Sequence, residues 1–315
     1  MAEESNDTSG IARRLGRDKM KELVNVLADQ LSGSELNSLL LEVYRSRTGA
    51  GSAAELLRRY RDNRFVKPAV VDPIDLRQLE LDVLRIARQH GFTPVQLSPV
   101  APIGSCSIVA TADQNKIISA TRGTEVVADA TNLLALHVSE GLQNGSLDNR
   151  ACNLHFCTTH RHVRAQQVPK APGMFAHFQV LCLVSSGIDR GSYSFEIGAF
   201  WEHIRAYRDI FHTRFDSEIE IILNARGGYK NADDLVQRIR RAGEEQSIPV
   251  RTAINPAKTD NRYYQGLQFT IKTTIQGKDH YIGDGGFVDW TQQLRNNRKE
   301  RFLISAIGLE RLLLL

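Results

Sequence analysis

The densest group of chemically capable side chains lies in the segment ACNLHFCTTHRHVRA, residues 151–165. Four of its residues are competent zinc ligands: Cys152, His155, Cys157 and His160. Their spacing contains neither a Cys-x-x-Cys nor a His-x-x-x-His pair, and on a strand only every second side chain shares a face. We therefore predict no metal site. Cys157, like Cys106, is expected to be a packed thiol, since no partner for a nucleophile can be assigned.

A second group combines positive charge with aromatic rings in ELLRRYRDNRFVKP, residues 55–68. Tyr60 and Phe65 stand among five cations: Arg58, Arg59, Arg61, Arg64 and Lys67. Such a segment can hold phosphates and stack bases, so an RNA-binding module is one hypothesis. A solvated helix face leading into a linker is the simpler interpretation, because runs of charge usually face water.

The composition of the whole chain is that of a folded protein with reduced thiols. Its 315 residues are 42% hydrophobic, and 40 Lys and Arg against 36 Asp and Glu leave a net charge of +4. This balance is too mild to indicate a dedicated nucleic-acid coat protein. With four cysteines, no secretion signal and no run of 18 apolar residues, we expect a cytoplasmic protein without disulfides and without membrane contact.

The elements that position these residues fall into two parts. From Ile11 to about Tyr60, leucines recur at three- and four-residue steps, which predicts two or three helices. Pro68 and Pro73 then interrupt the pattern. We therefore expect a helical N-terminal extension over residues 1–73 and a second domain over residues 74–315.

The second domain is predicted to be α+β. Helices are expected at 75–90, 129–143, 195–212, 232–246 and 290–302. The β-type runs are PVQLSPV, CSIVATA, KIISATR, NLHFCTT, HFQVLCLVSS, EIEIILNA, QGLQFTIKTTI and DHYIGDGGFVDW. Because helices and hairpins separate these runs irregularly, a largely antiparallel sheet flanked by helices is favoured over a regular βαβ alternation.

Three segments, in the expected order, resemble the signature motifs of class II aminoacyl-tRNA synthetases. QHGFTPVQLSPV is similar to the dimer-forming first motif. LHFCTTHRHVRAQ followed by FAHFQVLCLVSSG is similar to the second motif, two antiparallel strands joined by a loop. FLISAIGLERLLLL is similar to the third, a strand that leads into a helix. The resemblance implies a class II synthetase-like catalytic core over residues 74–315 and a homodimer formed through the first motif.

The second and third motifs imply an ATP site. Arg161 would hold the α-phosphate and Arg311 the γ-phosphate, with Mg²⁺ between phosphates, because a guanidinium fork makes paired charge-assisted hydrogen bonds to phosphate. The full set of ATP-binding residues that the resemblance implies is Arg161, His162, Arg164, Gly308 and Arg311. The sequence departs from the family at Val163, where a glutamate that holds the adenine side of the site is usual.

Finer features resemble the histidyl branch of this class and its paralogue, the regulatory subunit of ATP phosphoribosyltransferase. RYYQGLQFTI, GDGGFVD, FAHFQ and TRGTEVV are similar to segments around the amino-acid pocket of that branch. The implied pocket residues are Glu125 (or Thr124 if the register slips by one), Gln179, Tyr263, Tyr264, Gly285 and Gly286. The arginine that histidyl enzymes place before the tyrosine pair is not found, since Thr259 holds that position with Lys258 and Arg262 nearby. Histidine as the substrate is therefore not supported.

Two hypotheses for the function follow from the resemblance. The first is ATP-dependent adenylation of an amino acid or related carboxylic acid for a tRNA or carrier acceptor, with Arg161 and Arg311 as catalytic residues and without anticodon reading. Such catalysis rests on positioning and on positive charge rather than on covalent help. The alternative is a non-catalytic, regulatory or amino-acid-binding paralogue of histidyl-tRNA synthetase. The arginine pair favours the first hypothesis, whereas Val163 and the missing arginine favour the second.

Overall fold

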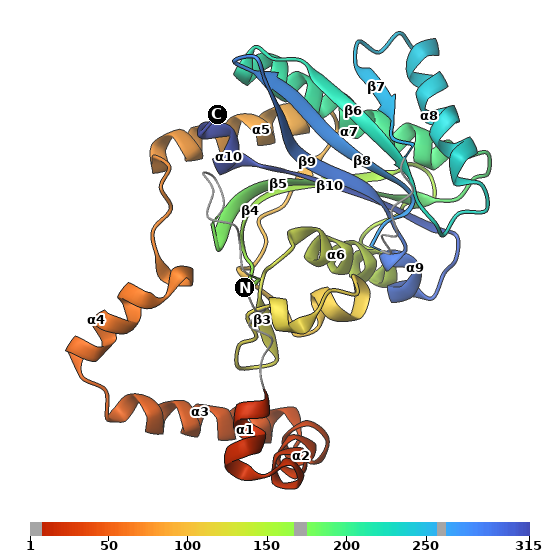
Figure 1. Cartoon of the computed structure of the whole chain (residues 1–315). Helices are drawn as coiled ribbons and strands as arrows, with labels where there is room; N and C mark the ends of the chain where they lie inside the picture. The colour runs from red at the N-terminus through yellow and green to blue at the C-terminus, as the bar shows by residue number, and fades with distance from the viewer. Residues whose placement is uncertain (1–7, 167–174, 257–262) are drawn as a thin grey trace.

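The computed structural model describes residues 8–166, 175–256 and 263–315, and Figure 1 shows their arrangement. A series of N-terminal helices leads away from a larger body that is built on one twisted sheet with helices on both faces. Within these residues, no helix has both the length and the apolar character needed to cross a bilayer.

The N-terminal part contains four α-helices and two short helical turns. They are α1 (Thr8–Leu15), α2 (Arg17–Asn25), η1 (Val26–Gln30), α3 (Gly33–Gly49), α4 (Ala53–Asp62) and η2 (Arg64–Val66). Ser32 and Glu35 start α3 with a reciprocal capping box, which satisfies two backbone donors at the helix end. No residue of α2, α3 or α4 is buried. The predicted helical extension is confirmed, and its boundary at residue 73 stays a prediction.

The body is organised around an eight-stranded sheet with the order β1-β4-β5-β10-β9-β8-β6-β7. Its strands are β1 (Thr93–Pro94), β4 (Leu154–Val163), β5 (His177–Ile188), β6 (Ile219–Ala225), β7 (Arg251–Ile254), β8 (Gln265–Ile275), β9 (Lys278–Val288) and β10 (Glu300–Gly308). Only the two edge pairs, β1 with β4 and β6 with β7, are parallel. A separate pair joins β2 (Val100–Pro102) to β3 (Thr124–Val126). The predicted α+β class with a largely antiparallel sheet is therefore confirmed.

Helices cover both faces of the large sheet (Figure 1). One face packs against α5 (Pro73–Gln89), α7 (Ser194–Phe215), α8 (Ala232–Glu245) and α10 (Leu309–Leu313). The other face packs against α6 (Ala130–Asn144) and α9 (Trp290–Arg295). Each strand divides its side chains between two cores by simple alternation: Leu181 and Leu183 of β5 join the α7 side, whereas Val180 and Cys182 join the α6 side.

Some of the sequence predictions of secondary structure were wrong. CSIVATA, expected as a strand, forms the π-helical turn η3 (Ser105–Val109), and KIISATR begins with the 3₁₀ turn η4 (Gln114–Lys116). Because the buried carboxylate of Glu125 accepts hydrogen bonds from the backbone N–H groups of Gly104 and Cys106, it holds the first segment as a loop. The helix expected at 290–302 ends at Arg295, because Asn296 turns into the left-handed region with φ 48°.

Candidate functional site

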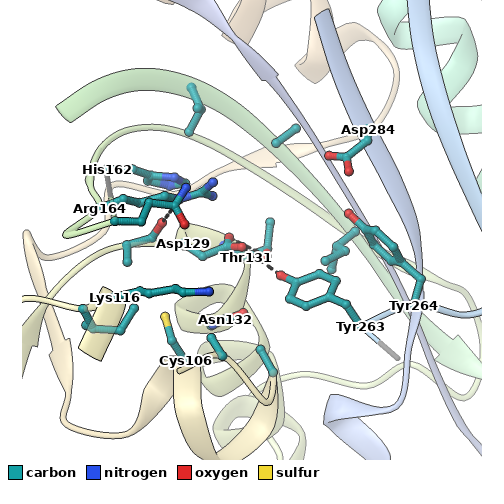
Figure 2. A pocket seen from close by; sticks show the side chains of 18 of the residues that line it. Cys106, Lys116, Asp129, Thr131, Asn132, His162, Arg164, Tyr263, Tyr264 and Asp284 are labelled. Atoms are coloured by element: carbon teal, nitrogen blue, oxygen red, sulfur yellow. Dashed lines mark hydrogen bonds between the residues drawn. The ribbon is translucent and has the colours of Figure 1, made fainter. Parts of the chain in front are cut away.

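A cavity of about 360 Å³ lies between the α6 face of the sheet and the start of α6 (Figure 2). This volume is at the small end of the range for small-molecule sites. Polar residues reach it from the η3–η4 segment, the start of α6, the end of β4, the residues before β8, and β9 and β10. They are Cys106, Lys116, Asp129, Thr131, Asn132, His162, Arg164, Gln166, Tyr263, Tyr264, Asp284 and Ser305.

Asp129 connects three of the elements around the cavity. Its Oδ1 caps α6 by accepting hydrogen bonds from the Thr131 N–H (2.9 Å) and hydroxyl (2.7 Å), and its Oδ2 accepts one from the Tyr263 hydroxyl (2.9 Å). Burial by itself would raise the pKa of this carboxyl, but His162, Arg164 and the Thr131 donors outweigh it and hold the pKa below the usual value. Asp129 is therefore a half-buried, ionised carboxylate at the centre of the site.

His162 has a fixed tautomer. Its Nε2 lies 2.9 Å from the backbone N–H of Ala130, which can only donate, so Nε2 is the unprotonated nitrogen. Burial lowers the pKa of the imidazole to about 3, with Asp129 opposing the shift, and the ring is neutral at physiological pH. The proton therefore sits on Nδ1, which is buried without a hydrogen-bond partner in the described parts of the chain.

Two cations stand on the same side of the cavity as His162 (Figure 2). Arg164 is held by one bond from its Nε to the carbonyl oxygen of Ala128 (3.1 Å), and its Cζ lies 5.3 Å from the ring centroid of Phe178. No hydrogen bond from its two Nη groups is found within the described residues, so they remain available to a ligand. Lys116 extends its amino group toward the cavity from the η4 turn.

The opposite wall carries a carboxylate and two phenols. Asp284 projects from β9 beside Tyr264, whose ring meets the Tyr263 ring edge-on at 4.9 Å. Burial, with the charge of Asp129 adding to it, raises the pKa of Asp284 above the usual value even though part of the side chain is open to solvent. Gly286 makes room for Tyr264, because a Cβ there would lie 2.5 Å from the Cδ1 of this ring.

The structure brings together some of the predicted site residues and not others. His162, Arg164, Tyr263 and Tyr264 line the cavity. Outside its lining lie Arg161, Gln179, Glu125, Gly285, Gly286, Gly308 and Arg311. The predicted roles of the second group stay predictions, and most of their side chains already have partners within the protein.

Arg161 and Gln179 belong to the other face of the sheet. Arg161 alternates with His162 along β4 and donates to Oε1 of Glu310 (2.6 Å) and to Nδ1 of His177 (2.9 Å). Gln179 is its cross-strand partner in β5 and donates to the carboxylate of Glu80 in α5. The alternation of the pleat thus directs both side chains toward α5 and α10, away from the cavity.

The remaining predicted residues have local structural contacts. Arg311 in α10 is half-buried, and its Nη1 donates to the carbonyl oxygen of Tyr281 (2.7 Å). Gly308 is the last residue of β10 and precedes α10. Glu125 accepts three hydrogen bonds from the segment after β2, including one from the Gln114 side chain (3.0 Å). Thr259, Lys258 and Arg262 lie outside the described residues.

The His, Cys and basic residues of segments 151–165 and 55–68 do not gather at one site in the described residues. Within the described residues, no group of three or more His, Cys, Asp or Glu side chains is placed to hold a metal. Burial raises the pKa of both the Cys106 and the Cys157 thiols to about 12, so neither forms the thiolate that a nucleophile requires. In the basic segment, Lys67 covers the ring of Tyr60 at 4.3 Å and Arg64 that of Phe65 at 4.4 Å. Each of the two rings therefore has one face occupied by a cation of the same segment.

Sequence reasoning missed Asp129, Asn132, Asp284 and Lys116. A helix-cap signal was present, because Asp129 is the first residue of the helix predicted over 129–143 and its partner Thr131 follows two residues later. Asp284 also carried a signal, as a charged residue set among glycines inside a predicted strand. Neither pattern indicates that the two carboxylates, 155 positions apart by their numbers 129 and 284, face one cavity.

Comparisons with known proteins identify the fold. The sequence matches no protein-family model and no curated protein. The structure is similar to histidyl-tRNA synthetase from S. aureus, with a TM-score of 0.58 and 11% identity over 79% of this chain and 68% of that one. It is also similar to an ATP phosphoribosyltransferase regulatory subunit/histidyl-tRNA synthetase from Bacillus halodurans, with a TM-score of 0.59 and 12% identity over 81% and 83% of the two chains.

A third similar structure is that of the RNA binding domain of threonyl-tRNA synthetase from Cryptosporidium parvum, with a TM-score of 0.58 and 9% identity over 76% and 63% of the two chains. At these identities the likeness concerns the fold. The chain has the fold of the class II aminoacyl-tRNA synthetase core, as the three sequence motifs predicted.

The ion pair of Arg161 with Glu310 should be structural. Glu310 is 1% exposed, so the Arg161→Gln variant leaves a buried carboxylate without its cation, and we expect the free energy of unfolding to fall by about 2–3 kcal/mol. Arg311→Gln, which removes an adjacent arginine bonded only to a carbonyl, should change it by less than about 0.5 kcal/mol. Urea unfolding measures both values. Equal effects of the two variants would contradict this assignment.

His162 should make the fold sensitive to acid. Its imidazole binds a proton near pH 6.5 when unfolded but only near pH 3 when folded, so protons favour the unfolded state between these values. The free energy of unfolding should therefore fall by up to about 1.4 kcal/mol per pH unit below 6.5 through this residue alone. His162→Gln should flatten the slope by that amount, and His212→Gln, at an exposed position in α7, serves as the control. Identical slopes in urea titrations of all three proteins would refute the prediction.

Proposed function

We propose that this chain is an amino-acid-binding relative of the class II synthetase core, and that its cavity holds an amino acid or a similar small zwitterion. The observation that carries the proposal is the separation of charge across one cavity (Figure 2). Arg164 and Lys116 stand on one side, and Asp284 stands on the other, with Asp129 between them. A molecule with one carboxylate and one ammonium group satisfies both walls at once.

The side chains on each wall favour a ligand whose carboxylate faces Arg164 and whose ammonium group faces Asp284. The free Nη groups of Arg164 present the planar fork that matches a carboxylate, and the donor on Nδ1 of His162 adds a further hydrogen bond on the same side. On the other side, a ligand ammonium would compensate the charges of Asp284 and Asp129. Both carboxylates line the same cavity, so an ammonium group there would be attracted by each of them.

The placement of the arginine pair favours binding over catalysis. Arg161 already neutralises Glu310, and Arg311 donates to a backbone carbonyl, so neither side chain is left without a role if ATP is not used. The sequence alone favoured adenylation because two arginines matched phosphate-binding positions, and the contacts of Arg161 and Arg311 within the protein give both side chains another role. Regulatory or ligand-sensing work requires only the cavity.

Adenylation is the second candidate, and the observation that favours it is that the two Nη groups of Arg164 make no hydrogen bond with the described residues. Arg164 lies at the end of β4 beside the neutral donor of His162 and near Lys116, so the three could together hold an α-phosphate. In that case ATP and Mg²⁺ would bind at the Arg164 side, and a tRNA or a carrier would accept the activated acid. A homodimer and a cytoplasmic location belong to either proposal.

Binding should depend on both charges of the ligand. In calorimetry across the common amino acids at pH 7.5, Asp284→Asn and Arg164→Gln should each weaken the best ligand by about tenfold or more, equal to about 1.4 kcal/mol. The N-acetyl derivative of that ligand should bind wild type weakly and lose little more with Asp284→Asn, because the ammonium group is already absent. Lys278→Gln, which removes an exposed cation at the first residue of β9, is the matched control. Failure of every amino acid to bind would sink the proposal.

The same panel can separate binding from adenylation. We expect Arg311→Ala to bind the ligand with unchanged affinity, because Arg311 lies outside the cavity lining. Pyrophosphate exchange with ATP, Mg²⁺ and each amino acid should be absent in wild type. Exchange that is present in wild type and abolished by Arg311→Ala would establish the second candidate in place of the first.

A further inference from the structure

Asn132 is a buried polar side chain whose hydrogen-bonding capacity is unused. It lies in the first turn of α6, it is 3% exposed, and it lines the cavity. Within the described residues, neither its Oδ1 nor its Nδ2 has a nitrogen or oxygen hydrogen-bond partner, and the interaction found for the side chain is a weak one with the thiol of Cys106. Buried amides are almost always satisfied, so a group of this kind calls for a partner that occupies the cavity.

Two features show that the unused capacity belongs to the site. The first is the position of Asn132, three residues after Asp129, on the cavity wall that Figure 2 shows below the carboxylate. The second is His162, whose Nδ1–H is a second buried and unpartnered donor in the same cavity lining. The backbone contact of Ala130 with Nε2 fixes this donor, and Ala130 itself belongs to the same turn of α6 as Asn132.

An amide side chain sets a specific requirement on its partner. Its oxygen only accepts and its nitrogen only donates, side by side in one plane. A partner with the complementary pair makes two nearly linear hydrogen bonds at once, whereas a carboxylate places a second acceptor against Oδ1 and a methyl group leaves both atoms unsatisfied.

We propose that the ligand of this cavity carries a planar edge with a donor beside an acceptor, and that Asn132 reads this edge. The proposal rests on the proposed function and adds the chemistry of the remaining part of the ligand. Such an edge has two sources among small molecules: the carboxamide of an amino acid such as asparagine or glutamine, and the amino-purine edge of an adenine nucleotide. In each case Asn132 acts as a specificity determinant and takes no part in a reaction.

The experiment compares matched ligand pairs by calorimetry with the full chain at pH 7.5. The pairs are L-asparagine with L-aspartate, L-glutamine with L-glutamate, and AMP with purine riboside 5′-monophosphate, which lacks the exocyclic amine. Wild type should bind the member that carries the paired edge at least about tenfold more tightly in at least one pair, because a site built to hydrogen-bond a group rejects an analogue that lacks it. The pair that responds identifies the source of the edge.

Asn132→Leu is the decisive variant, because leucine has nearly the same size and removes both polar atoms. The preference within the responding pair should fall to within about threefold of unity. The variant should also unfold at a urea concentration equal to or higher than that of wild type without ligand, because replacing an unsatisfied buried amide by an apolar group of similar shape is neutral or stabilising. A lower midpoint would show that Asn132 has satisfied partners within the protein and would overturn the proposal.

The results separate this proposal from the one on which it rests. If amino acids bind and Asp284→Asn weakens them, but no pair differs in wild type, the reading of an edge by Asn132 is wrong and the zwitterion site stands. A preference that persists in Asn132→Leu has the same consequence, since another residue must then be the reader. If no amino acid and no nucleotide binds to wild type, both proposals fail together.

Discussion

The arrangement of the site depends on one half-buried carboxylate, that of Asp129. Asp129 caps α6, accepts the hydroxyl hydrogen of Tyr263 from the segment before β8, and faces the charge of Arg164 at the end of β4. A carboxylate removed from water is tolerated only when donors and opposite charge surround it. The elements that supply these groups must therefore stay close together, and the cavity is the space that they enclose. His162 also joins β4 to the start of α6, because Nε2 of its neutral ring accepts a hydrogen bond from the backbone N–H of Ala130, the residue after Asp129.

Because side chains alternate along each strand, the sheet directs its polar residues to two different faces. Side chains of β4 and β5 that point toward α6 meet the cavity, and those that point toward α7 and α10 meet the apolar core. Arg161 falls on the second face. There its guanidinium joins Glu310 of α10 to His177 of β5, and Nε2 of His177 in turn contacts the carbonyl oxygen of Lys67 at 2.6 Å. One arginine therefore connects the C-terminal helix, two strands and the segment that follows η2.

The sequence was sufficient for the class of fold and for its longest strands and helices, and it was insufficient for the direction of particular side chains. Hydrophobic runs and three spaced motifs predicted a largely antiparallel sheet with helices on its faces, because these patterns depend on local periodicity. Arg161 was assigned to ATP from its place in a motif, although a shift of one residue along a strand moves a side chain to the other face. His162 and Arg164, only one and three positions further, line the cavity.

The loop from 105 to 122 shows a second limit of sequence reasoning. CSIVATA and KIISATR have the β-branched character of strands, yet Glu125 bonds the first of them into a turn, because its carboxylate accepts from the backbone N–H groups of Gly104 and Cys106, which lie 21 and 19 positions earlier. Those contacts are tertiary, and no local pattern contains them.

Hydrogen bonds from the residues around η2 attach the N-terminal extension to the body. Its last turn reaches the site, because Nη2 of Arg64 donates to the carbonyl oxygen of Ala165 at 2.5 Å, one residue beyond Arg164. Lys67 is tied to the start of β5 through His177. Helices α2 to α4 bury none of their own residues, and a further attachment comes from α3, where Oδ1 of Asn37 accepts a hydrogen bond from the backbone N–H of Arg122 at 2.9 Å. The extension is therefore joined to the body both beside the end of β4 and at the loop before β3, through polar contacts rather than through a shared apolar core.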